Sequence, residues 1–263
     1  MYAELETCGL RLTGKLLEGK RVLLTGAASP RGLGKATAAL LVEHGAKVVI
    51  ADIDYEAALR AVADVGAAAA VRFDARDPAS CRQVVEDAVD HLGGLDGLVP
   101  MVGVTVGGAF DEITADQVDM LFDINARSTF LVIQAAVPHL KSGTRPAVVC
   151  MSSVAGQRGG GLYGTSAYSA SKAAVNAIGK AYGRELAPMG IRVNTISPAL
   201  INTDVEGNPN QTPEIRQGFE KLVPMGRSGS RWEVPGVVLF LLSDLSTFMA
   251  GATVDVNGGL HIH

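Results

Sequence analysis

The chain has 263 residues, which is enough for one large domain with a substantial core. Its composition is 48% hydrophobic and 19% charged, which excludes an intrinsically disordered chain. A net charge of −4 without a basic run argues against nucleic acid as a partner. Three scattered cysteines support neither a disulfide framework nor a cysteine-based metal site, and no apolar run is long enough to span a bilayer. These features predict a cytoplasmic protein without a metal, nucleic-acid or membrane partner.

Hydrophobic patterning alternates between two periods along the chain. Short apolar runs followed by turn residues predict strands at 21–25, 47–51, 70–73, 95–99, 147–151, 191–196 and 253–256. Helical spacing predicts helices from Leu33 to near Gly45 and at 55–65, 78–91, 115–137, 166–186 and 232–242. This alternation predicts an α/β fold in one domain spanning 1–263, a doubly wound Rossmann fold with a seven-stranded parallel sheet flanked by helices. Residues 1–18 are expected to be a short N-terminal extension, and the unpatterned stretch 202–229 a substrate-binding loop.

A glycine-rich turn follows the first predicted strand and reads Thr25-Gly26-Ala27-Ala28-Ser29-Pro30-Arg31-Gly32-Leu33-Gly34. Binding sites of such sheets lie at the carboxyl ends of the strands. Glycines there allow a tight turn and let a phosphate approach the amides at the start of the next helix. The spacing is not the usual G-x-G-x-x-G, so this turn alone is also compatible with a plain connection.

The second predicted strand ends at Asp52. A carboxylate in this place can accept hydrogen bonds from the hydroxyl groups of an adenosine ribose, and it would repel a 2′-phosphate. An ordinary helix cap is the alternative interpretation. Together, the glycine turn and this carboxylate favour a dinucleotide site.

Tyr168 and Lys172 lie one turn apart on one face of the helix predicted at 166–186. A phenol has a pKa near 10, and lowering it by about three units takes roughly 4 kcal/mol, the size of its interaction with one ammonium group at about 4 Å. Lys172 can supply that charge. A hydroxyl of Ser152 or Ser153, at the end of the fifth strand, can face the same substrate oxygen. The alternative is a surface pair, because Tyr-x-x-x-Lys spacings are common.

Taken in order, these motifs resemble the short-chain dehydrogenase/reductase family, in its single-domain branch of about 250 residues. The resemblance covers roughly residues 16–260. The matching features are the glycine turn, Asp52, Asp74, Asn125, Ser153-Val154-Ala155-Gly156, Tyr168, Lys172, Ile191-Arg192-Val193-Asn194, Pro198, Ile201, Thr203 and Asp255-Val256-Asn257-Gly258-Gly259.

The resemblance implies an oxidoreductase that transfers a hydride between a nicotinamide cofactor and a secondary alcohol or ketone. It implies that Tyr168 is the general acid/base, that Lys172 lowers its pKa and binds the nicotinamide ribose, and that Ser153 polarises the substrate oxygen. Asn125 would hold a water that connects Lys172 to solvent, and the chain would form a homotetramer. The residues implied to bind the cofactor are Gly26, Ser29, Arg31, Gly32, Leu33, Gly34, Asp52, Ile53, Asp74, Ala75, Val102, Gly103, Tyr168, Lys172, Pro198, Ile201 and Thr203.

The sequence departs from the family pattern near the expected site. Ser29-Pro30 lengthens the glycine turn, and Pro100-Met101-Val102-Gly103 stands where the family has Asn-Asn-Ala-Gly. Since proline cannot donate a hydrogen bond to a strand ladder, we expect altered geometry after the fourth strand. Ala199 stands where the family has glycine, and the glycine-rich stretch 159–164 lengthens the connection to Tyr168.

Cofactor choice rests on two opposing residues. Asp52 favours NAD, whereas Arg31 occupies a position where NADP-dependent relatives often carry a basic residue. A 2′-phosphate bears nearly two negative charges, so the carboxylate favours NAD. An NADP(H)-dependent carbonyl reductase and a catalytically silent dinucleotide sensor remain alternatives, whereas a methyltransferase-like domain would not need Tyr168 and Lys172.

The substrate is expected to be a small uncharged secondary alcohol or ketone, because most candidate wall positions are apolar. These positions are Val104, Thr105, Val106, Gln157, Leu162, Tyr163, Leu200 and 205–225.

Overall fold

A computed structural model describes residues 14–160, 166–203 and 212–262. Residues 1–13 of the predicted N-terminal extension lie outside this range, as do residues 204–211 of the predicted substrate loop. Two candidate wall residues, Leu162 and Tyr163, also lie outside the described residues.

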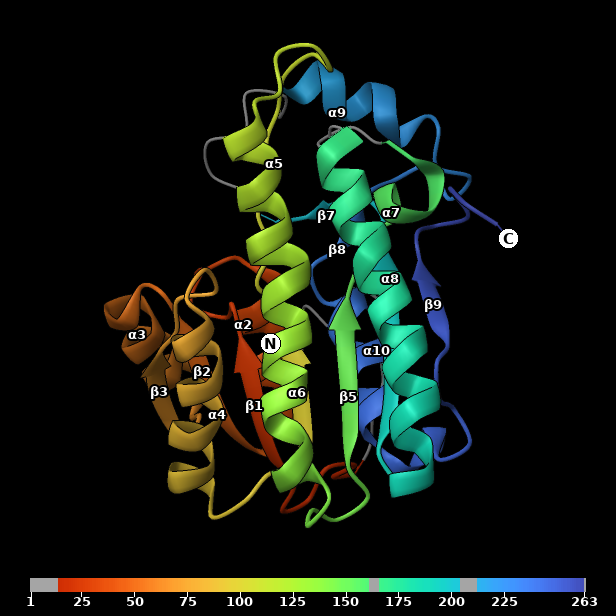
Figure 1. Cartoon of the computed structure of the whole chain (residues 1–263). Coiled ribbons are helices and arrows are strands. Elements are labelled where there is room, and N and C mark those ends of the chain that lie inside the picture. Colours follow the sequence, from red (N-terminus) through yellow and green to blue (C-terminus); the bar gives the residue numbers. More distant parts are fainter. Residues whose placement is uncertain (1–13, 161–165, 204–211, 263) are drawn as a thin grey trace.

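Within the described residues, a sheet of seven parallel strands forms the centre of the molecule (Figure 1). The strands are β1 (Arg21–Thr25), β2 (Lys47–Asp52), β3 (Ala69–Arg72), β4 (Gly97–Pro100), β5 (Ala147–Met151), β6 (Arg192–Pro198) and β9 (Thr253–Val256). Their order is β3-β2-β1-β4-β5-β6-β9, so the direction of strand succession reverses between β1 and β4. This arrangement confirms the predicted doubly wound α/β fold.

Helices cover both faces of the sheet (Figure 1). On one face lie α2 (Leu33–Glu43), α3 (Tyr55–Val65) and α10 (Glu233–Leu242), and on the other lie α4 (Pro78–Leu92), α6 (Ser128–Leu140) and α8 (Ser166–Leu186). Side chains of a strand alternate between the faces, so Val149 of β5 packs in one core cluster and Val148 in the other. Burial on both faces explains why these strands read as continuous apolar runs.

The helix predicted at 115–137 is interrupted, so that prediction was wrong in its middle. It consists of α5 (Ala115–Leu121), a π-helical turn η1 (Phe122–Arg127) and α6, which continues past Pro138. A single π-helical turn adds one residue without changing the apolar pattern enough to be seen in the sequence. Such turns often occur at functional sites, and this one carries the fully buried Asn125.

The stretch predicted to lack regular structure, 202–229, contains α9 (Pro213–Glu220), which is a second correction. The segment is bracketed by two short parallel strands, β7 (Ile201–Asn202) and β8 (Gly229–Ser230). The helix is short and mostly polar, and an Arg216–Glu220 ion pair at 3.6 Å supports its last turn. A helix of this kind has no apolar stripe long enough to be read from sequence.

The end of β4 shows the effect expected of Pro100. β4 pairs with β1 as far as Pro100 and Thr25, but its register with β5 runs only from Gly97 to Leu98. The ladder toward β5 therefore stops before the proline that lacks an amide hydrogen.

Shorter helical turns complete the described fold: α7 (Ala155–Arg158), η2 (Ala187–Met189) and η3 (Asp244–Ser246). No helix in the described ranges combines the length and apolarity needed to cross a membrane.

Candidate functional site

The glycine turn after β1 is packed too closely for side chains. A Cβ atom on Gly26, whose φ is +72°, would lie 2.7 Å from the backbone nitrogen of Val102, and a Cβ on Gly34 would lie 2.4 Å from the carbonyl oxygen of Gly26. A Cβ on Gly32 would lie 2.9 Å from Cβ of Ser29. These glycines let the turn, the loop after β4 and the start of α2 approach one another.

The start of α2 is suited to an anion. Gly32 is its N-cap and provides no side-chain hydrogen bond, so the first helical amides keep their donors for a ligand. Leu33 packs against the core beneath the turn, while Arg31 is exposed on it. The uncapped amides, the helix dipole and the close glycine contacts fit the pyrophosphate of a dinucleotide at this place.

Asp52, at the end of β2, lies against the same turn. Its Oδ2 accepts a hydrogen bond from the backbone nitrogen of Ala28 at 3.0 Å, and its Oδ1 accepts one from Asp54 at 3.3 Å. The cap of α3 is supplied by Asp54, which accepts a hydrogen bond from Ala57 at 2.9 Å. The alternative interpretation of Asp52 as a helix cap is therefore wrong, because Asp54 caps α3 and the carboxylate of Asp52 connects β2 to the glycine turn. Ile53, the next residue, is 57% exposed.

Asp74 follows β3 and is held in a local turn. Its Oδ1 accepts a hydrogen bond from the backbone nitrogen of Arg76 at 2.9 Å, and its own amide donates to Ser80 Oγ at 2.9 Å. Ala75 is buried next to it, and the amide of Phe73 donates to the carbonyl of Asp52 at 2.8 Å. The structure thus places Asp74 and Ala75, two of the predicted cofactor-binding residues, close to the predicted ribose carboxylate Asp52.

Tyr168 and Ser153 meet beyond the end of β5. Tyr168 lies in the first turn of α8, and Ser153 lies between β5 and α7. Burial raises the pKa of Tyr168, and a hydrogen bond with Ser153 opposes that shift. In the protein alone, the pKa of the phenol is thus displaced upward, opposite to the lowering that catalysis at neutral pH requires.

Lys172 is buried below Tyr168. Its Nζ donates a hydrogen bond to the carbonyl oxygen of Met151 at 3.0 Å and lies 6.0 Å from the centroid of the Tyr168 ring. Burial lowers the pKa of Lys172 to about 8, so the ammonium form still predominates at neutral pH. A Cβ on Gly103 would lie 3.0 Å from this Nζ, so a larger residue at this place in the loop after β4 would crowd the ammonium. Any lowering of the Tyr168 pKa by Lys172 stays a prediction.

The choice between the two serines follows from their partners. Ser152 is buried and its hydroxyl donates to the carbonyl of Lys172 at 2.8 Å, so it fastens β5 to α8. Ser153 Oγ accepts a hydrogen bond from Ala155 at 3.2 Å and is the hydroxyl that bonds with Tyr168. A Cβ on Gly156 would lie 2.6 Å from the backbone carbon of Lys172, so this glycine lets the serine turn approach α8. The motif contained Gly156, but its role was not apparent from sequence.

Asn125 connects two parts of the site. Its Oδ1 accepts from the backbone nitrogen of Val104 at 2.8 Å, and its Nδ2 donates to the carbonyl of Val104 at 3.0 Å and to Ser171 Oγ at 2.9 Å. Ser171 Oγ in turn donates to the carbonyl of Tyr168 at 2.8 Å. The amide therefore clamps the loop after β4 against the tyrosine helix, and the predicted water relay stays a prediction.

The segment after β6 forms the other side of the site. Pro198 is buried and its carbonyl oxygen accepts a hydrogen bond from the amide of Val154 at 2.8 Å, whereas the amide of Ala199 donates to the carbonyl of Val256 at 3.1 Å. Ile201 lies in β7, and the amide of Thr203 donates to its carbonyl at 2.9 Å. The bonds of Pro198 and Ala199 join the start of this segment, which carries predicted cofactor-binding residues, to both the serine turn and the end of β9.

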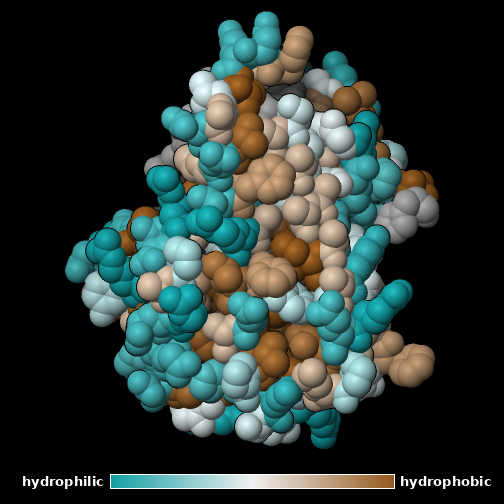
Figure 2. All heavy atoms as spheres, viewed as in Figure 1, coloured by the Kyte–Doolittle hydropathy of each residue, from teal (hydrophilic) through white to brown (hydrophobic). Residues whose placement is uncertain are grey.

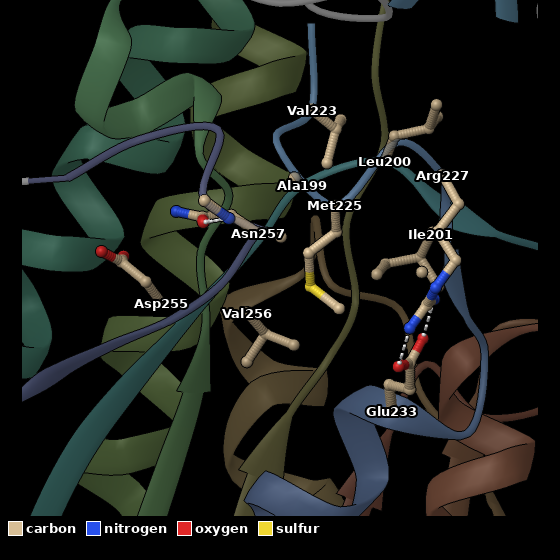
Figure 3. Close-up of a pocket in the computed structure, with 13 residues that line it drawn as sticks. Ala199, Leu200, Ile201, Val223, Met225, Arg227, Glu233, Asp255, Val256 and Asn257 are labelled. Atoms are coloured by element: carbon tan, nitrogen blue, oxygen red, sulfur yellow. Dashed lines mark hydrogen bonds and ion pairs between the residues drawn. The ribbon is translucent and has the colours of Figure 1, made fainter. Parts of the chain in front are cut away.

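A cavity of about 320 Å³ lies beside this segment (Figure 3). Its lining includes Ile201, Met225 and Asn257, and one rim is closed by Arg227, whose two nitrogens each lie 2.8 Å from an oxygen of Glu233. Tyr168, Lys172 and Ser153 do not line it. We interpret it as an extension of the site behind the segment after β6.

Gln157, a substrate wall position expected from sequence, uses both ends of its side-chain amide in hydrogen bonds to neighbouring strand ends. Its Nε2 donates to Asp255 Oδ1 at 2.8 Å, and its Oε1 accepts from Ser197 Oγ at 2.5 Å. Both ends of the amide are therefore used to join α7 to the ends of β6 and β9. Sequence could not reveal this because the three residues are far apart along the chain.

Comparisons with known proteins agree with this arrangement. A family model described as "Enoyl-(Acyl carrier protein) reductase" matches residues 26–261. A 2,5-dichloro-2,5-cyclohexadiene-1,4-diol dehydrogenase from Sphingobium indicum is 35% identical over 92% of this chain and 96% of the relative. A sorbitol dehydrogenase from Cereibacter sphaeroides is 35% identical over 92% of this chain and 98% of the relative.

Among solved structures, a glucose/ribitol-type short-chain dehydrogenase/reductase from Brucella melitensis superimposes with a TM-score of 0.87 at 30% sequence identity. The match covers 95% of this chain and 100% of that structure. The family model, the relatives and the solved structure all agree with the motifs and with their order along the chain. Members of this family bind a nicotinamide dinucleotide. The chain belongs to the short-chain dehydrogenase/reductase family.

Proposed function

We propose that the protein is an NAD(H)-dependent oxidoreductase that interconverts a small uncharged secondary alcohol and its ketone. The observation that carries the proposal is the group formed by Tyr168, Ser153 and the buried ammonium of Lys172 at the carboxyl edge of the sheet. Two hydroxyl groups can bind one substrate oxygen there, and one of them has a positive charge nearby to favour its ionised form.

In the proposed reaction, the phenolate oxygen of Tyr168 accepts the hydroxyl proton of the alcohol during oxidation and returns it to the ketone oxygen during reduction. Ser153 Oγ donates a hydrogen bond to that same oxygen and orients it. Lys172 holds positive charge below the phenol, and its remaining donors can bind a ribose. When bound, the nicotinamide supplies the hydride acceptor or donor.

The choice of NAD rests on Asp52. Its carboxylate lies against the glycine turn, 3.0 Å from the amide of Ala28, where an adenosine ribose would meet it. Ribose hydroxyl groups can donate to a carboxylate, whereas a 2′-phosphate would be repelled by it. We infer that Asp52 selects NAD and that Arg31, which is exposed in the same turn, does not offset this repulsion.

The substrate class is argued from the walls and from the relatives. The loop after β4, which Asn125 holds against the tyrosine helix, carries the half-buried apolar side chains of Val102, Val104 and Val106, and these favour an uncharged substrate. Relatives carry names of dehydrogenases of hydroxyl compounds, a cyclohexadienediol and sorbitol. In this proposal the segment 202–229 with α9 covers the substrate, and the single domain works in the cytoplasm.

We also propose a homotetramer. Figure 2 shows hydrophobic side chains gathered along the surface over α6 and α8. Phe130 of α6 is 41% exposed, and the centroid of its ring lies 5.2 Å from that of Tyr182 of α8; Phe122 of the adjoining η1 is 37% exposed. Exposed aromatic surface on one face suits a closed two-fold contact between identical helices, and α10 with the C-terminal strand would supply another. Sedimentation showing a monomer at micromolar concentration would contradict this.

The proposed activity is tested by following the absorbance of reduced nicotinamide with a panel of neutral secondary alcohols and ketones. We expect turnover with NAD for at least one alcohol, with charged analogues much slower. Tight NADH binding without turnover on any member of the panel would favour the silent-sensor alternative. A wild-type preference for NADP would overturn the cofactor assignment.

A further inference from the structure

A second cavity, of about 490 Å³, lies between α2, the end of α3 and the residues just before α10. None of the catalytic or cofactor residues named above lines it. Its apolar wall comes from Ala36, Ala39 and Val42 of α2 and from Val65 of α3. The volume falls in the range of pockets that hold small organic molecules.

Two buried polar atoms of this cavity's lining residues lack hydrogen-bond partners in the described part of the chain. They are the indole nitrogen Nε1 of Trp232, a donor, and the carboxylate oxygen Oε2 of Glu43, an acceptor. Trp232 is only 7% exposed, so bulk water does not solvate its N–H group freely. A buried donor or acceptor without a partner destabilises the fold, and a ligand that supplies the partner removes this penalty. Because both residues line this cavity, a ligand bound in it could satisfy both atoms.

The charges around the cavity are balanced. Lys35 and Asp64 form an ion pair at 2.5 Å, and the guanidinium of Arg231 lies 5.2 Å from the centroid of the Trp232 ring. With Glu43, these side chains contribute two positive and two negative charges. A net-neutral lining favours a ligand without net charge, because a lone ion would lose its hydration without a matching counter-charge.

We propose that this cavity binds a small uncharged organic molecule with an apolar body and a hydroxyl or primary amide group. Such a group has an oxygen that accepts from Trp232 Nε1 and a hydrogen that it donates to Glu43 Oε2. The apolar body contacts the alanine and valine side chains of α2 and α3. The proposal is independent of the proposed oxidoreductase activity, because it uses none of the catalytic residues.

The cavity also touches elements that border the cofactor site. Pro30, in the lengthened glycine turn, forms part of its lining, and Trp232 follows β8, which pairs with β7 of the segment after β6. A molecule bound here would therefore contact the neighbours of both ends of the dinucleotide site without occupying it.

Trp232 is the single tryptophan of the chain, so its fluorescence reports on this cavity. We would titrate the protein with cyclohexanecarboxamide, which is not an alcohol or ketone, and with cyclohexanecarboxylate as the charged control. We expect saturable binding of the amide in the millimolar range, a fluorescence change, and at least roughly fivefold weaker binding of the carboxylate. Binding should persist with saturating NAD, which separates this cavity from the catalytic site.

Two variants test the assigned atoms by calorimetry. Trp232→Phe removes the donor and Glu43→Ala the acceptor, and each should weaken binding of the amide by roughly fivefold. Asp90→Ala, an exposed carboxylate on α4 at the other face of the sheet, should leave binding unchanged. Thermal unfolding checks that each variant is folded. Equal binding of amide and carboxylate, loss of binding when NAD is added, no fluorescence response, or unchanged binding in both cavity variants would overturn the proposal.

Discussion

Each edge of the central sheet holds a buried charged side chain, Asp96 at the amino edge and Lys172 at the carboxyl edge, and the surroundings of the two charges differ. At the amino edge, Asp96 accepts hydrogen bonds from Nε and Nη2 of Arg21 at 2.7 and 2.8 Å and from the amide of Thr144 at 2.6 Å. At the carboxyl edge, Lys172 is equally buried, but its ammonium faces no carboxylate among the hydrogen bonds and ion pairs of the described residues.

The difference is visible in the two pKa values. Burial acts to raise the pKa of Asp96, but the hydrogen bonds from Arg21 and Thr144 outweigh it and hold the pKa below its usual value. Burial lowers the pKa of Lys172 to about 8 because no such partners compensate it. A buried charge that is paired with an opposite charge is compatible with a stable fold. A buried charge without such a pair destabilises the folded state, and a binding site can keep it because a ligand interacts with it.

The largest expected effect is on catalysis at the carboxyl edge. Tyr168→Phe keeps the ring and removes the hydroxyl that exchanges the proton, so kcat should fall by about 10²- to 10⁴-fold. The melting temperature and NADH binding should change little, because the aromatic ring is kept and the hydroxyl that is lost bonds with Ser153 inside the site. Steady-state kinetics and NADH titration check this, and a variant that keeps most of its turnover would refute the acid/base role.

The converse experiment is at the amino edge. Asp96→Ala leaves the partly buried Arg21 without its carboxylate and removes acceptors from two backbone amides, so unfolding should become easier by about 2–4 kcal/mol. Activity per folded molecule should stay near that of the wild type below the melting temperature. Chemical denaturation measures the loss. The exposed Asp90→Ala is the control, with an expected change within about 0.5 kcal/mol.

A smaller effect is expected on cofactor choice. Asp52→Ser removes the acceptor for the ribose hydroxyls, so kcat/KM with NAD should fall by about ten- to a hundredfold. The efficiency with NADP should rise by a comparable factor, since Arg31 can then approach a 2′-phosphate. Asp52→Ser combined with Arg31→Ala should lose the gain with NADP. An unchanged ratio of the two efficiencies in Asp52→Ser would exclude this carboxylate as the selector.

The smallest effect expected is a gain of stability. The pKa of Lys172 is about 8 in the folded protein against an ordinary 10.5, so folding is opposed by roughly 3 kcal/mol at pH 7, where both states are protonated. That cost disappears as pH rises from about 8 to 10.5, because the folded lysine becomes neutral first. Lys172→Met should therefore be inactive but more stable at pH 7, by about 1–3 kcal/mol after loss of the bond to Met151.

Unfolding without cofactor at several pH values tests this sign. The advantage of Lys172→Met over the wild type should shrink toward pH 10.5, and Lys180→Met, on the exposed side of the same helix, should show no such trend. A methionine variant that is less stable than the wild type at pH 7 would contradict the account of the buried ammonium.

The fold was largely predictable because its signal is repeated in every strand. Buried parallel strands such as β1 and β5 are short apolar runs, and the turn at Gly26 follows one of them directly. The π-helical turn around Asn125 and the polar helix α9 were missed because neither changes the apolar pattern over enough residues.

For the site, sequence predicted Tyr168, Lys172 and Ser153 by spacing and family resemblance, and the structure brings these three residues together. It did not show that Ser152 holds the backbone of Lys172 or that Gln157 spans from Ser197 to Asp255. Such bonds depend on which strand ends become neighbours, and only the folded chain determines that.

The central claim is that hydride leaves the carbinol carbon of a secondary alcohol while Tyr168 receives the hydroxyl proton. The most direct measurement uses the best alcohol from the substrate panel, deuterated at that carbon, with NAD and the wild-type enzyme. NMR of the isolated reduced cofactor should show one deuterium at the nicotinamide ring, transferred to one face only, and Tyr168→Phe should form almost none in the same time. Deuterium that is absent from the cofactor, is scrambled between both faces, or forms equally fast with Tyr168→Phe would contradict the account.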